Sequence, residues 1–129
     1  MREDYVSFEI AKFLKEKGFD WICSVVYDLE RPKSCKDNKY YTNFGTLNHN
    51  KWPDLVSAPT LQMAMKWLRE VKNIFISVDY SYICGQYKHT ICLADSSLNH
   101  KYGANVDYDY KTYEEAVEAA LKYALTNII

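Results

Sequence analysis

The stretch that decides the fold is residues 74–80, IFISVDY, which places an apolar side chain at every second position. This period of two is typical of a β-strand with one buried face. A turn at Gly85 follows, and residues 87–93, YKHTICL, return with Ile91 and Leu93 at inward positions. We therefore predict an antiparallel β-hairpin. Its first strand has Ile74, Ile76, Val78 and Tyr80 on one face and Phe75, Ser77, Asp79 and Ser81 on the other.

Helices are predicted on both sides of this hairpin and at the start of the chain. Ser57 is suited to cap the middle helix, with Pro59 in its first turn, where a missing N–H has no cost. Thr112 and Glu115 form a capping box for the last helix. The first helix is expected over residues 7–17. The middle helix carries an apolar stripe of Leu61, Ala64, Met65, Leu68 and Val71, with Met63 and Trp67 on its flank.

A second pair of strands is predicted between the first and middle helices. Residues 21–27 are rich in β-branched and aromatic side chains, and residues 39–46 can pair with them. Residues 47–56 are expected to form a loop, and a further short strand is possible between Tyr102 and Tyr108. The sequence thus predicts a single α+β domain over residues 1–129. Its order is helix, strand pair, helix, strand pair, helix, with a two-layer, mainly antiparallel sheet of about four strands packed by three helices.

The charge balance of the sequence argues against a general polyanion such as nucleic acid as the partner. Among 129 residues, 16 Lys and Arg balance 17 Asp and Glu, whereas a general polyanion-binding domain is far more basic. No signal-like or membrane-spanning apolar run occurs, so we expect a cytoplasmic protein without membrane contact. In that compartment the four cysteines are expected to be free thiols, with Cys23 and Cys92 acting as small apolar residues in strands.

The sequence contains no recognisable catalytic, metal or cofactor motif. Its four glycines stand far apart, which excludes a phosphate-binding loop, and no cysteine pair has Cys-x-x-Cys spacing. Cys35, between Lys33 and Lys36, is the thiol best placed for a lowered pKa. We expect a protein that is not an enzyme and needs no cofactor. The alternative is a small enzyme with a site built from loops around His49, His100 and Asp107.

Residues 31–52 combine positive charge with aromatic rings. Cationic side chains neutralise phosphates and aromatic faces stack on bases, so a single-stranded nucleic-acid binder is a second interpretation. A solvated loop explains the same residues and is the interpretation we favour. The candidate patch consists of Lys33, Lys36, Lys39, Tyr40, Tyr41 and Trp52.

Tyrosine is the compositional outlier, with 12 Tyr against 5 Phe and 3 Trp. Exposed tyrosines suit protein interfaces, because each supplies a large contact area and a polar tip at little entropic cost. Cross-strand pairing on a solvated sheet face is the alternative explanation. We expect a protein partner or a homodimer, bound through some of Met63, Trp67, Tyr80, Tyr82, Tyr87, Tyr108 and Tyr110.

Three helical stretches, residues 6–20, 58–71 and 112–123, together resemble a family of small uncharacterised proteins of gut Bacteroidetes and of their phages and mobile elements. No activity, cofactor or catalytic residue follows from this resemblance. It implies a cytosolic setting and an accessory role connected with a mobile element.

Overall fold

The computed structural model describes residues 4–28, 39–41, 48–94, 99–102 and 110–129. The chain divides into two compact units, Met1–Thr60 and Leu61–Ile129, and each unit is described here by itself. The described residues form three α-helices and antiparallel strands in the predicted alternation, which confirms the α+β class. The two strand pairs lie in two separate sheets, and each pair is joined by a third strand.

The first unit begins with helix α1, Phe8–Glu16. The Ser7 hydroxyl oxygen caps it by accepting a hydrogen bond from the Ile10 N–H (3.3 Å). Gly18 ends it with a φ of +92°, a conformation that favours glycine. The helix buries Ile10, Ala11 and Leu14.

The sheet of the first unit has the strand order β2-β1-β3. Strand β1, Val25–Asp28, is antiparallel to both β2, Lys39–Tyr41, and β3, Leu55–Ser57. The Tyr27 hydroxyl donates a buried hydrogen bond to the Val6 carbonyl oxygen (2.7 Å), and its ring packs edge-on against Phe8. These contacts join the sheet to the segment that leads into α1.

The predicted loop over residues 47–56 is wrong, because it contains the 3-10 turn His49–Lys51 and part of β3. Ser57 is not a helix cap either: its N–H donates to the Asn50 Oδ1 atom (2.9 Å), and the next residue, Ala58, donates to the Val25 carbonyl oxygen (2.8 Å). Pro59 disfavours a helical conformation at Ala58 and so supports the extended path. The helix consequently starts only at Leu61.

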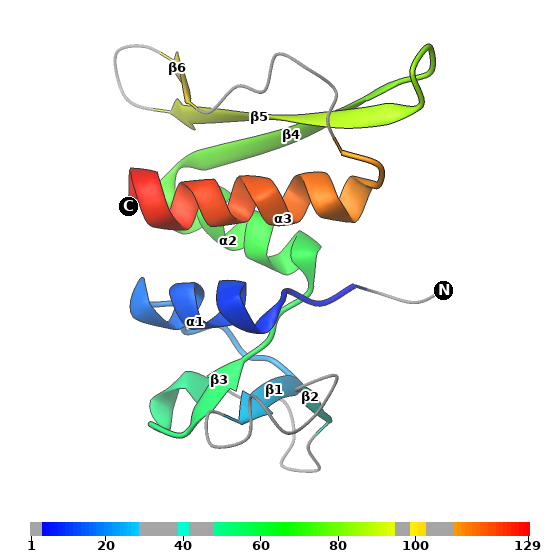
Figure 1. The fold of residues 1–129 in the computed structure, drawn as a ribbon. Helices are drawn as coiled ribbons and strands as arrows, with labels where there is room; N and C mark the ends of the chain where they lie inside the picture. The colour runs from blue at the N-terminus through cyan, green and yellow to red at the C-terminus, as the bar shows by residue number, and fades with distance from the viewer. Residues whose placement is uncertain (1–3, 29–38, 42–47, 95–98, 103–109) are drawn as a thin grey trace. The chain divides into compact units, whose positions relative to one another are not determined.

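The second unit contains α2, Leu61–Lys72, and a sheet of order β4-β5-β6. Asn73, with a φ of 57°, turns the chain from α2 into β4, Ile74–Ser81. Strands β5, Gln86–Ala94, and β6, Asn99–Tyr102, complete this sheet, with β4 and β6 on opposite sides of β5 (Figure 1). The predicted hairpin is confirmed, and its register pairs Ile76 with Ile91.

Helix α3, Tyr113–Tyr123, continues into a π-helical turn, Ala124–Ile128. The predicted Thr112 cap is confirmed, because its Oγ1 atom accepts from the Glu115 N–H (3.1 Å). The return bond of the capping box is shifted by one residue: a Glu115 carboxylate oxygen accepts from the Lys111 N–H (3.2 Å). Both α2 and α3 contact β4, and α3 also contacts β5. The face of the sheet that they cover buries Ile74, Ile76, His89 and Ile91.

No helix in the described part of the chain is long and apolar enough to cross a membrane.

Candidate interaction surface

The turn of the β4–β5 hairpin holds the most exposed large apolar side chains of the described residues. Tyr82 and Ile83 are each 85% exposed. The turn is fixed by two hydrogen bonds to Ser81: its carbonyl oxygen accepts from the Gly85 N–H (2.7 Å), and its hydroxyl oxygen accepts from the Cys84 N–H (3.5 Å). Gly85 has a φ of +70°, which a larger residue rarely adopts. The turn therefore presents Tyr82 and Ile83 to solvent from a defined backbone.

The base of this turn is a stack of tyrosines. Tyr80 and Tyr87 are cross-strand partners whose ring centroids lie 4.8 Å apart. The Tyr113 ring, at the start of α3, meets Tyr87 edge-on at 6.3 Å, and the Gln62 side chain of α2 donates to the Tyr113 hydroxyl (3.0 Å). The Tyr113 end of the stack is thus tied to both helices of this unit, while Tyr80, at the other end, stays 54% exposed. The hairpin extends beyond the start of α3 in Figure 1.

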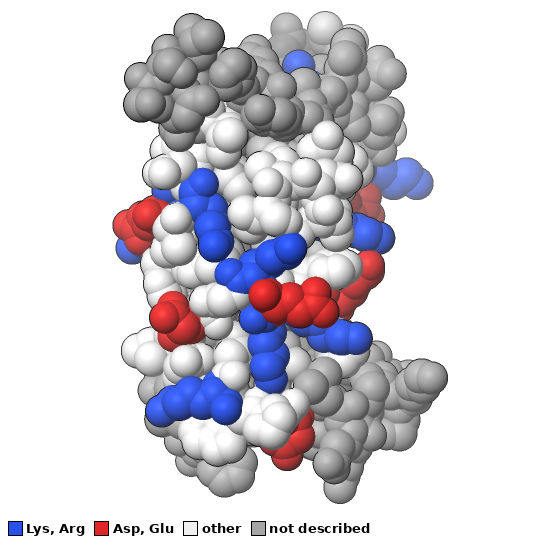
Figure 2. Space-filling model, turned by 90° about the vertical axis from the view of Figure 1, so that its left-hand side faces the viewer, with Lys and Arg blue, Asp and Glu red and all other residues white. Residues whose placement is uncertain are grey.

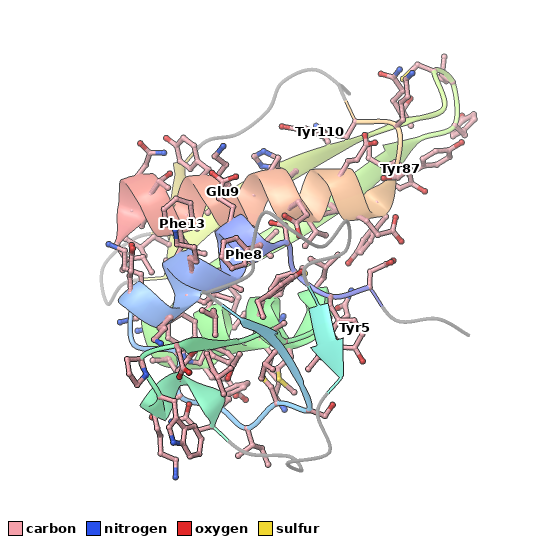
Figure 3. The ribbon with its side chains drawn as sticks, turned by 60° about the horizontal axis from the view of Figure 1, so that its bottom comes forward. Tyr5, Phe8, Glu9, Phe13, Tyr87 and Tyr110 are labelled. Atoms are coloured by element: carbon pink, nitrogen blue, oxygen red, sulfur yellow. The ribbon has the colours of Figure 1, made fainter. Side chains whose placement is uncertain are left out.

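Tyr110 joins the same region from the segment that precedes α3. Its backbone pairs with Tyr87 through two hydrogen bonds, 2.7 and 3.1 Å long, and Figure 3 shows the two residues on neighbouring segments. Its ring lies 5.5 Å from the ring of His89, which is only 5% exposed. The His89 Nδ1 atom makes no hydrogen bond to any residue that the structure describes, and burial lowers the pKa of this imidazole. We read His89 as a neutral residue that packs beneath Tyr110.

The structure divides the predicted partner residues. Tyr80 and Tyr82 are exposed, Tyr87, Tyr110 and Met63 are half-buried, and Tyr108 lies outside the described residues. Trp67 is 1% exposed, so its prediction as a docking residue is wrong. The apolar arc of α2 is covered around Trp67, and the Lys72 ammonium lies 5.6 Å from the centre of its ring. The sequence analysis missed Ile83, although its position next to Cys84-Gly85 in a turn was a usable signal.

The basic and aromatic segment is only partly described. Lys33 and Lys36 lie outside the described residues, and Lys39, Tyr40 and Tyr41 form strand β2 opposite Tyr27, Val26 and Val25. Trp52 is exposed, with the Lys51 ammonium 5.5 Å from its ring centre. Figure 2 draws both Lys or Arg and Asp or Glu side chains among the described residues. The nucleic-acid interpretation stays a prediction.

The candidate catalytic residues do not form a described cluster. His49 begins the 3-10 turn of the first unit and His100 lies in β6 of the second, whereas Asp107 and Cys35 fall outside the described residues. Within the described ranges, no group of three or more His, Cys, Asp and Glu could hold a metal ion. Cys23 is buried as expected, and burial raises the pKa of its thiol to about 11.

Comparisons with known proteins do not assign this chain to a family: no protein-family model, no curated protein and no solved structure matches it.

Proposed function

We propose that the chain is a protein-binding module and that its second unit docks a partner protein through the turn of the β4–β5 hairpin. The observation that carries the proposal is the 85% exposure of both Tyr82 and Ile83 on a hydrogen-bonded turn. Two large apolar side chains at neighbouring positions are exposed to water in the free chain. Burying them in a partner's pocket would stabilise the complex through the hydrophobic effect. A turn held by its own backbone also has little conformational entropy to lose on binding.

The charge of the turn defines the chemistry of the partner. Residues 80–87, YSYICGQY, contain no Lys, Arg, Asp or Glu. Phosphate backbones and anionic lipids are recognised through clustered positive charge, which this turn does not have. The matching surface is an apolar pocket on a protein, rimmed by neutral groups that can hydrogen-bond the hydroxyls of Tyr80 and Tyr82.

An accessory role fits this proposal. The resemblance of the three helical stretches to small proteins of mobile elements implies such a role, and a recognition surface requires no chemistry of its own. We extend the proposal to a cytoplasmic partner in that setting.

Crosslinking identifies the partner and a reconstituted complex tests the proposal. A photoreactive phenylalanine analogue at Tyr80 should yield a discrete protein adduct in source cells, and that protein is then purified for binding measurements. We expect the double variant Tyr82→Ser, Ile83→Ser to raise the dissociation constant of the complex at least tenfold, as for residues that dominate an interface. Ile22→Ser, which removes another exposed apolar side chain (58%), is the matched control and should change it less than twofold.

Two results would contradict the proposal. One is equal affinity of the double variant and the control for the purified partner. The other is binding of the chain to neutral phosphatidylcholine vesicles that depends on Tyr82 and Ile83, which would make the turn a membrane contact.

A further inference from the structure

The two sheets differ in how the backbone groups of their edge strands are covered. In the first unit, the β3 edge is covered by side chains: Asn50 accepts from the Ser57 N–H, and the Lys15 ammonium donates to the Leu55 carbonyl oxygen (2.7 Å). In the second unit, β6 and Tyr110 pair along the outer side of β5. Among the described residues, β4 pairs with β5 alone, so one side of β4 forms the edge of this sheet.

Strand β4 carries none of the devices that block pairing at an edge. It extends over Ile74–Ser81, with no proline, glycine or lysine and a single charged residue, Asp79. Natural edge strands are protected by such residues, by bulges or by being short. The regular register from Ile74 opposite Leu93 to Ser81 opposite Gln86 leaves no bulge in β4. Alternate residues therefore direct backbone N–H and C=O groups away from β5.

We propose that a second copy of this chain pairs with β4 in antiparallel fashion, with Ser77 opposite its own copy on the two-fold axis. On the helix-covered face of β4, apolar or aromatic residues lie symmetrically about Ser77. In this register Ile74 faces Tyr80 and Ile76 faces Val78 of the second copy, so every residue of the helix-covered face meets an apolar or aromatic partner. The β4-β5-β6 sheets of the two copies then form one continuous six-stranded sheet.

Charge disfavours the two registers centred nearer the hairpin turn. Pairing centred on Asp79 would place two carboxylates directly opposite one another, and pairing centred on Val78 would place them on a short diagonal. With Ser77 at the centre, each Asp79 lies opposite Phe75, and the two carboxylates are about 14 Å apart, beyond the Debye length at physiological ionic strength. The exposed side of Phe75 then gains a neighbour across the dimer.

The dimer has a consequence for partner binding, although it does not depend on the proposed function. Antiparallel copies of β4 place the two hairpin turns at opposite ends of the shared sheet. Tyr82 lies outside the paired positions, so the turns stay free. A dimer of this kind would bind two partner molecules, or one partner with two sites at higher avidity.

A pair of opposite charges at Ser77, which is exposed on the solvent face of β4, tests the pairing. Light scattering over a concentration series should show a dimer for the unmodified chain. Ser77→Lys and Ser77→Glu should each raise the dissociation constant of the dimer at least tenfold, because two like charges then meet on the two-fold axis. Mixing the two variants should restore a dimer, because the introduced charges are then complementary. Circular dichroism and the melting temperature of each variant establish that it is folded.

Three outcomes would overturn the inference: an unmodified chain that is monomeric at its highest soluble concentration, dimers that persist in both variants, or monomeric variants that do not reassociate on mixing. The double variant Tyr82→Ser, Ile83→Ser should dimerise normally. The two proposals are tested separately by these variants. The proposed function predicts that the double variant loses partner binding but still dimerises, and this inference predicts that each Ser77 variant loses the dimer but still binds the partner.

Discussion

Tyr87 and Tyr110 exchange two backbone hydrogen bonds, with the Tyr87 N–H donating over 2.7 Å and the Tyr110 N–H over 3.1 Å. This pairing holds the segment that leads into α3 against the outer side of β5, next to the tyrosine stack that supports the hairpin turn. It also brings the Tyr110 ring over His89. The candidate surface therefore depends on a contact between residues far apart in the chain.

Removing one of these two hydrogen bonds should loosen the stack. Tyr110→Pro has no N–H to donate, so we expect a loss of about 1–3 kcal/mol in the free energy of unfolding and faster hydrogen exchange at the Tyr87 amide. Tyr110→Phe keeps both backbone bonds and the ring, and should stay within about 0.5 kcal/mol of the unmodified chain. Equal exchange rates at Tyr87 in the two variants would contradict the role of this pairing.

His89 should make stability fall in mild acid. Because burial lowers its pKa below the ordinary 6.5, the unfolded chain binds a proton more readily than the folded one. The stability contributed by the neutral imidazole is complete above pH 6.5 and decreases as the pH falls from there toward the lowered pKa. Denaturant unfolding of the unmodified chain and of His89→Leu between pH 5 and 8 should give curves that diverge below pH 6.5, with the variant relatively more stable in acid. Parallel curves would show that His89 is not the titrating group.

Cys23 and Cys84 should differ sharply in reactivity. With the pKa of Cys23 raised to about 11, about one in a thousand of its thiols is ionised at pH 8, and the residue is buried. Cys84 is exposed in the hairpin turn. Alkylation with iodoacetamide followed by peptide mass spectrometry should label Cys84 in the folded chain and Cys23 only after denaturation, where the two rates should converge. Rapid labelling of Cys23 in the folded chain would contradict its burial.

Asn50 should be a sensitive polar residue of the first unit. Its Nδ2 atom donates to the Phe19 carbonyl oxygen (2.8 Å) and its Oδ1 atom accepts from the Ser57 N–H (2.9 Å), so Asn50→Ala removes two partly buried hydrogen bonds. We expect it to lower the free energy of unfolding by about 2 kcal/mol. Lys51→Ala, which removes only an exposed contact with Trp52, is the neighbouring control and should cost less than about 1 kcal/mol. Similar losses in the two variants, measured by denaturant unfolding, would argue against the edge-covering role of Asn50.

The elements that the sequence predicted well are those whose signal is local. Residues 74–79 alternate in burial as their pattern predicts, although Tyr80, expected on the inward face, is 54% exposed. Thr112 caps α3 by accepting from the Glu115 N–H, as their spacing predicts. Strand β3 was missed because three residues are too few for a period, and its formation depends on pairing with β1. Ser57 has the side chain of a helix cap, but the hydrogen bonds from its own N–H and from Ala58 keep the chain extended there.

The candidate surface was predictable only in outline. Tyr80 and Tyr82 were expected at a partner surface and are exposed, whereas Trp67, on a helix flank that the sequence leaves ambiguous, is buried. A helical pattern shows which side chains share a face, but how wide an arc is covered depends on the other elements that pack against it.

By itself, the sequence determined the α+β class, the three helices with the Thr112 cap of the last, and the alternation at the start of the central hairpin. Periodicity, capping and turn chemistry act between residues close together in the chain. Only the tertiary structure decided that the strands form two sheets, that β3 exists, that Tyr110 pairs with Tyr87 and that Ile83 is exposed while Trp67 is not. Strand pairing and burial depend on contacts between residues distant in the sequence. The residue pattern of one segment does not specify which other segments pack against it.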